Sequence, residues 1–127
     1  MNLKFSSVVL QNDNEFKTEY ETTYDEKVVD DFIVFNFKDN YDVEQEIWVS
    51  ASEVKIFFGD QKIELSKGKK IQHWYKTEHG QIPMYWFLRD VYTDFNQVWF
   101  SYDLLDSTKQ QNIIGTTTIN LITTENK

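Results

Sequence analysis

The chain has 127 residues and a formal net charge of −8, with 13 basic side chains, 21 acidic side chains and no cysteine. This length suits one domain with a buried core, since 40% of the residues are hydrophobic and 17% are aromatic. The negative charge disfavours nucleic acid and anionic membranes as partners, and the lack of cysteine excludes disulfides, thiolate metal sites and a cysteine nucleophile.

The N-terminal segment "MNLKFSSVVLQNDNEF" has only a short apolar run and no cleavage pattern, so it is not typical of a signal peptide. No apolar run approaches the length of a membrane-spanning helix. We therefore expect a cytoplasmic protein that forms a single domain over residues 1–127.

The acidic residues are concentrated in one part of the chain. Residues 13–46 carry 12 acids and three lysines, whereas residues 47–127 carry nine acids and nine bases. Solvated strand faces and turns are the simpler explanation of this segment. The alternative is a docking surface for a cation or a basic partner.

Alternation of apolar and polar residues with a period of two is the dominant pattern, and it predicts β-strands. In "EFKTEYETTY" it places Phe16, Tyr20 and Tyr24 on one face and charged residues on the other. The same alternation predicts strands in "DFIVFNF", "VEQEIWVS" and "NQVWFSYDLL". Their expected inward side chains are Ile33, Phe35, Phe37, Val43, Ile47, Val49, Val98, Phe100, Tyr102 and Leu104.

Two turns are predicted in the middle of the chain. A two-residue loop in "FFGDQ" places Ile56 opposite Ile63, so that apolar residues meet across the hairpin. A three-residue loop in "SKGKK", residues 67–69, then places Leu65 opposite Ile71.

A third turn is predicted in "TEHGQIP". Pro83 has no N–H to donate, so it prefers a position where its nitrogen points away from the partner strand. This favours a four-residue loop at 78–81 over a two-residue loop at 79–80. Either loop places His73 opposite Trp86.

The C-terminal segments complete the pattern. "IIGTTTINLITT" is rich in β-branched residues and predicts a last strand with a bulge at Gly115. A short helical turn in "DVYTDF" is the single helical feature that the pattern allows. About eight to ten antiparallel strands with short turns indicate a sandwich or a closed barrel, and a barrel leaves no aromatic edge strand exposed.

Several segments resemble the YwiB-like proteins, a bacterial family of unknown function with a lipocalin-like β-barrel. They are "VKIFFGDQKIEL", "WYKTEHGQIPM", "WFSYDLL" and "IIGTTTINL". The family's tyrosine–x–threonine–x–x–glycine signature falls on Tyr75, Thr77 and Gly80, and its tyrosine–x–leucine step falls on Tyr102 and Leu104. The resemblance implies an all-β, closed antiparallel lipocalin-like (calycin-type) barrel.

The chain departs from the family at two places. The family often has a basic residue before the glycine that corresponds to Gly59, where this chain has Phe57 and Phe58. The family also often has an acid near the aromatic residue of the third strand, where this chain has Asn36 and Phe37. No ion pair between these positions is expected, and the resemblance implies no activity.

Catalytic and metal-binding motifs are not predicted. His73 and His79 lie on the order of 15–20 Å apart in an extended segment, so one ion does not bind both. The sequence contains no HExxH, calcium-loop, G-x-S-x-G or glycine-rich phosphate motif. We expect no metal, no cofactor and no enzymatic activity.

Two binding modes are therefore considered. In the first, a small apolar or aromatic ligand binds inside the barrel, against the large inward residues Tyr20, Phe35, His73, Tyr75, Trp86, Phe100 and Tyr102. These residues would also be able to fill the interior without a ligand. In the second, an outer aromatic patch binds another protein or a second copy of the chain. Its expected residues are Trp74, Tyr85, Phe87 and Trp99, with Trp48 and Phe57 also pointing outward.

Overall fold

The computed structural model describes residues 2–59, 61–106 and 112–124, and for residues 75–77 it describes the backbone alone. These residues form ten strands in one sheet, which confirms the predicted strand number. The strands are β1 (Asn2–Gln11), β2 (Asn14–Val29), β3 (Phe32–Lys38), β4 (Glu44–Val49), β5 (Glu53–Phe58), β6 (Gln61–Ser66), β7 (Lys70–Thr77), β8 (Gly80–Asp94), β9 (Gln97–Leu105) and β10 (Ile113–Thr124). Their order in the sheet is β6-β5-β4-β3-β2-β1-β10-β9-β8-β7, and the neighbours are antiparallel.

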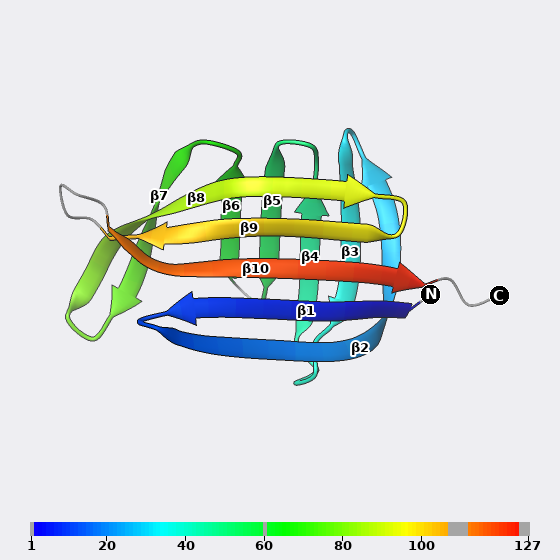
Figure 1. Cartoon of the computed structure of the whole chain (residues 1–127), viewed down its shortest axis with the longest axis horizontal. Coiled ribbons are helices and arrows are strands. Elements are labelled where there is room, and N and C mark those ends of the chain that lie inside the picture. Colours follow the sequence, from blue (N-terminus) through cyan, green and yellow to red (C-terminus); the bar gives the residue numbers. More distant parts are fainter. Residues whose placement is uncertain (1, 60, 107–111, 125–127) are drawn as a thin grey trace.

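The two longest strands fold this sheet over on itself. The first part of β2 pairs with β1 as far as Thr23, and its last part pairs with β3 from Tyr24 onward. In the same way, β8 pairs first with β7 and then with β9. Figure 1 shows the result: β1, β8, β9 and β10 lie across β3 to β6, so that the sheet forms a nearly closed barrel.

The core lies between these two layers and follows the predicted alternation. The buried apolar side chains of the core cluster are Leu3, Tyr24, Phe35, Phe37, Ile47, Val49, Val54, Ile56, Ile63, Leu65, Trp86, Leu88, Val98, Phe100, Tyr102, Ile119 and Leu121. Alternate residues of each strand point inward because successive side chains of a β-strand lie on opposite faces. Burial on the inward face of β2 increases along the strand, from the exposed Phe16 to the buried Tyr24, and Val43 lies exposed before β4 begins.

Two local predictions are confirmed by the register. The β5–β6 hairpin pairs Ile56 with Ile63 and closes at Phe58 and Gln61, as expected for a two-residue loop. The pairing of β9 with β10 shifts between Ile113 and Gly115, which confirms the predicted bulge.

The predicted register between β7 and β8 is wrong by two residues, because the centre of the turn lies one residue earlier than expected. The hairpin closes at Thr77 and Gly80, so its register places Trp74 opposite Pro83, and it places His73 opposite Met84 and not opposite Trp86. Gly80 has a φ of 114°, a conformation that glycine adopts at little cost, and this favours the earlier turn. Counted from the closing pair, Trp74 and Pro83 form a pair without ladder hydrogen bonds. The constraint from Pro83 is therefore met by moving the turn and not by lengthening the loop.

The predicted β6–β7 hairpin does not form. The N–H of Lys67 donates to Ser52 O at 2.8 Å and that of Gly68 donates to Leu88 O at 3.1 Å, so the chain leaves β6 without turning back along it. A single parallel bridge between Lys67 and Leu88 links these ends. The barrel is thus nearly closed and not fully closed, and β6 and β7 are the edges of the sheet.

The helical turn suggested for "DVYTDF" is also wrong. Strand β8 continues to Asp94, and its pairing with β9 extends to Asp94 and Gln97. A bulge between Leu88 and Asp90, which the sequence pattern did not indicate, precedes this extension. Pairing with a long neighbouring strand supplies backbone hydrogen bonds that an isolated helical turn does not have.

Candidate functional site

Four of the predicted interior residues, His73, Trp86, Phe100 and Tyr102, are joined by contacts between their rings. Phe35, Trp86, Phe100 and Tyr102 are buried, and the ring centroids of Trp86 and Tyr102 lie 5.3 Å apart. Phe100 stacks on Tyr102 at 6.3 Å, and the half-buried His73 lies 6.3 Å from Trp86. Side chains therefore fill this part of the barrel. The side chain of Tyr75 lies outside the described residues.

Tyr20 belongs to a different part of the interior. Its ring stacks on Phe5 at 4.7 Å, and Phe5 in turn contacts Phe37 at 6.0 Å. Burial, followed by the negative charge of Asp39, raises the pKa of the Tyr20 phenol above its ordinary value. The seven predicted ligand-binding residues thus do not all line one space.

A hollow of about 880 Å³ lies beside the β3–β4 loop, against the middle of β2, the end of β3, the start of β4 and the end of β5. It is open to solvent, and its lining includes five acids and one lysine. The acidic groove, as we call it, is lined by Thr22, Thr23, Tyr24, Asp25, Asn36, Phe37, Lys38, Asp39, Asp42, Glu44, Gln45, Glu46, Phe57 and Gly59. Most of these residues come from the acid-rich segment 13–46, so the fold gathers part of that segment's charge around one hollow.

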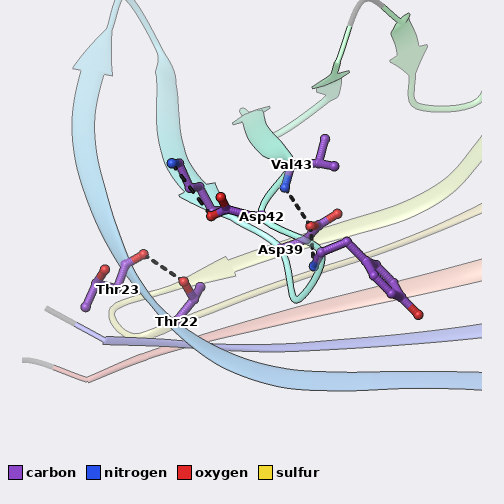
Figure 2. Close-up of polar contacts among 7 residues, drawn as sticks. Thr22, Thr23, Asp39, Asp42 and Val43 are labelled. Carbon is purple, nitrogen blue, oxygen red and sulfur yellow. Dashed lines mark hydrogen bonds and ion pairs between the residues drawn. The ribbon is translucent and has the colours of Figure 1, made fainter.

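Asp39 shapes one wall of the acidic groove (Figure 2). Its Oδ1 accepts hydrogen bonds from the N–H groups of Tyr41 at 2.8 Å and Val43 at 2.9 Å. Its Oδ2 accepts a hydrogen bond from Gln45 Nε2 at 3.1 Å. Asp42, on the same loop, lies 3.7 Å from Lys38 Nζ. The Asp39 carboxylate is therefore occupied in ordering the loop, which leaves other acids to contact a ligand.

Four neighbouring strands place a row of side chains along the acidic groove. The register sets Asp25 opposite Asn36, Asn36 opposite Glu46 and Glu46 opposite Phe57. Adjacent strands lie about 4.8 Å apart, so the backbones of Asp25 and Glu46 lie on either side of Asn36 at roughly 10 Å from each other. This arrangement suits a cationic group more than an anionic one.

The β7–β8 hairpin exposes apolar side chains on its outer face. Trp74 is 54% exposed on this face. Ile82 is also exposed, but it is paired with Tyr75 and lies on the opposite face of the hairpin. Tyr85 and Phe87 are half-buried and lie opposite Gln72 and Lys70, which corrects the predicted pairing. The aromatic hairpin face, defined here as Trp74, Pro83, Tyr85 and Phe87, does form on one side of the hairpin as the alternation predicts.

The other predicted outward aromatics lie elsewhere. Trp99 is half-buried on β9, opposite Tyr92. Trp48 packs edge-on against Phe32 at 5.7 Å and against Phe57 at 6.3 Å, with Lys55 Nζ 5.6 Å from its ring. These residues cover the outer side of β3 to β5, where Val34 is fully buried. The outward aromatics thus form more than one group.

A buried carboxylate on the outer side of the sheet was not predicted. Asp103 on β9 is 4% exposed, accepts a hydrogen bond from Thr116 Oγ1 at 2.7 Å and lies 3.8 Å from Arg89 Nε. Arg89 is the extra residue of the β8 bulge and the chain's single arginine. Alternation assigned Asp103 correctly to the outer side, but no sequence signal indicated that the bulge would cover it.

Membrane and metal features are limited. Within the described part of the chain, no helix has the length and apolarity needed to cross a membrane. Over the same residues, no group of three or more histidine, aspartate or glutamate side chains is arranged to hold a metal ion.

The comparisons with known proteins concern the fold. No protein-family model and no curated protein matches the chain. The crystal structure of the YwiB protein from Bacillus subtilis is similar, with a TM-score of 0.69 and 16% identity, over 98% of this chain and 91% of that one. This likeness supports the YwiB-like fold indicated by the sequence motifs. At 16% identity it shows the fold alone.

Proposed function

We propose that this protein is a non-catalytic interaction protein that binds a partner protein through the aromatic hairpin face. The observation that carries the proposal is the exposure of Trp74, whose side chain is 54% exposed. Trp74 lies on β7, at the edge of the sheet, on the same face of the hairpin as Tyr85 and Phe87 of β8. Tryptophan and tyrosine are enriched among the residues that contribute most to protein–protein binding. A large indole left in water on the hairpin is therefore available to a partner's apolar pocket.

The partner we propose offers apolar and aromatic side chains to Trp74, with a polar rim. Pro83 lies directly opposite Trp74 and adds a rigid apolar surface next to the indole. Burial of apolar surface contributes roughly 25 cal/mol per Å², so an indole that becomes fully covered supplies a useful part of the binding energy.

The test compares two exposed aromatics at different ends of the barrel. A photo-crosslinking amino acid at position 72, next to Trp74, is expected to trap a defined partner in the native host. Trp74→Lys should abolish that crosslink, whereas Phe95→Ser should retain it, because Phe95 is 96% exposed at the β8–β9 turn. Equal crosslinking by both variants would contradict the proposal.

A second candidate uses the acidic groove, which would bind a basic peptide or a polyamine. The gathering of five acids around a hollow of about 880 Å³ favours it. Charge attraction of this kind weakens as ionic strength rises, since the Debye length shortens from ~10 Å at 0.1 M to ~3 Å at 1 M salt. Titration with spermine tests this candidate. The double variant Asp25→Asn with Glu46→Gln is compared with the unaltered chain, and Glu53→Gln is the control.

A small apolar ligand inside the barrel is the least supported of the proposals, because the rings of Trp86, Phe100 and Tyr102 contact each other. The lipocalin-like assignment and the cytoplasmic location also belong to what we propose, and a dimer through the aromatic hairpin face is the alternative to a partner protein. Native mass spectrometry of protein from its own host tests the ligand and the dimer in one measurement.

A further inference from the structure

We infer that the partner of the proposed interaction adds an extended strand to the open edge of β7, and that this strand alternates acidic with apolar side chains. The inference rests on the proposed function, because it specifies how the same hairpin binds. The topology provides the first part of the argument: β6 and β7 follow one another in the chain, yet among the described residues each ends the sheet. Figure 1 shows β7 slanting away from β6 after the residues that join them.

The backbone of β7 has the orientation that strand addition needs. Trp74 and Pro83 form a pair without ladder hydrogen bonds, and Gln72 and Tyr85, two positions along, form another. The N–H and C=O groups of Gln72 and Trp74 therefore point away from β8, toward the open edge. Such a row of backbone groups is a template on which an extended segment pairs.

The side chains beside this edge indicate what the added strand carries. On the inward side, Ile71 and His73 are half-buried, so apolar side chains of the added strand would continue the core. On the outward side, Gln72 and Trp74 are exposed. Because successive side chains of a strand alternate between the two faces, apolar and polar residues are expected to alternate in the partner.

The charge beside this edge favours acidic residues at the polar positions of the partner strand. Strand β7 itself, Lys70–Thr77, carries two lysines and no acid, whereas the rest of the chain carries 11 bases and 21 acids. The edge region is thus the basic part of an acidic protein. A second copy of the chain is disfavoured as the occupant, because two such edges would bring like charges together.

The test uses synthetic peptides as probes, each with eight residues to match the length of β7. A fluorescein-labelled peptide with alternating valine and glutamate is titrated with the full chain and followed by fluorescence anisotropy. We expect saturable binding that weakens with salt, and at least ~10-fold weaker binding when lysine replaces each glutamate. Absence of binding by the glutamate peptide would overturn the inference.

Backbone pairing is tested without altering the protein. Two methylated forms of the peptide are made, and each is N-methylated at the alternate nitrogens that point to one of its two edges. Because methylation removes the donors of that edge, we expect one of the two forms to lose binding. Equal binding by both methylated forms would overturn strand addition, even if the peptide still docks on Trp74. In the protein, Gln72→Pro should weaken binding at least ~10-fold while Gln72→Ala should not, because proline removes the outward N–H.

The results separate the inference from the proposed function. One combination of results would retain the interaction face and reject strand addition. In it, Trp74→Lys loses the host crosslink, but neither Gln72→Pro nor N-methylation weakens peptide binding. Sedimentation of the chain as a dimer that Gln72→Pro dissociates would identify a second copy as the occupant and would overturn the proposed acidic partner.

Discussion

Arg89 Nε lies 3.8 Å from Oδ2 of Asp103, which joins the chain's single arginine to a carboxylate that is only 4% exposed. The β8 bulge makes this contact possible, because the pairing with β9 passes from Leu88 to Asp90 and leaves Arg89 as the extra residue. The other oxygen of Asp103 accepts the hydroxyl of Thr116 on β10 at 2.7 Å. The carboxylate therefore links the three adjacent strands β8, β9 and β10.

Replacement of Asp103 by alanine should lower the free energy of unfolding by about 1–3 kcal/mol, because the Thr116 hydroxyl loses its acceptor and the β8 bulge loses its partner. Urea unfolding followed by tryptophan fluorescence measures the change. Asp25→Ala is the matched control, since Asp25 is exposed, and it should change stability by less than about 0.5 kcal/mol. Equal effects of the two substitutions would show that the buried carboxylate has no stabilising role.

Phe100→Ala should cost about 3–5 kcal/mol of stability, the range for removing a large ring from a packed core. Phe100 is fully buried and stacks on Tyr102, so its removal leaves a cavity between the two layers. Phe95→Ala, at a site 96% exposed, should have little effect in the same unfolding experiment. A small loss for Phe100→Ala would mean that the interior is loosely filled, and it would favour a ligand inside the barrel.

Gly80→Ala should destabilise the protein by about 1–2 kcal/mol, because a side chain is strained at a φ of 114°. No neighbouring atom lies within 4 Å of the added Cβ, so the expected cost is conformational and not steric. Gln81→Ala, on the next and exposed residue of β8, is the control. Thermal unfolding of the two variants should show the lower melting temperature for Gly80→Ala.

The protein should lose stability as pH rises above about 10, the ordinary pKa of tyrosine. Burial and Asp39 raise the pKa of Tyr20 in the folded state, so the unfolded chain releases this proton at a lower pH than the folded chain does. Stability is then fully present below the unfolded pKa and falls as pH rises toward the folded pKa. Tyr20→Phe should remove part of this alkaline decline, measured as the urea midpoint from pH 8 to 11. An unchanged slope would contradict the assignment to Tyr20.

The sequence was informative where a prediction depended on neighbouring residues. The β5–β6 hairpin and the bulge at Gly115 follow from turn chemistry and alternation, which act over a few positions. The two-residue error in the β7–β8 register has a local cause as well. Both registers keep the same residues inward, so alternation did not distinguish between them, and the conformation of Gly80 did.

Predictions that depended on distant contacts were less successful. The β6–β7 hairpin was expected from "SKGKK", but the backbone of Lys67 and Gly68 bonds to Ser52 and Leu88 instead. The contact of Asp103 with Arg89 joins residues 14 positions apart in the sequence, and the bulge in β8 brings them together. The acidic groove likewise needs four strands to bring its lining residues together.

The sequence by itself determined that the chain forms an antiparallel fold of about eight to ten strands, which faces of most strands point inward, and that its acids are concentrated before residue 47. These properties follow from the period of a β-strand and from composition, both of which are local. The tertiary structure decided that β6 and β7 stay apart, that the interior aromatics fill the barrel and that Trp74 remains in water. Those outcomes depend on where β2 and β8 bend, because each bend sets which residues from distant parts of the chain share the limited space between the two layers.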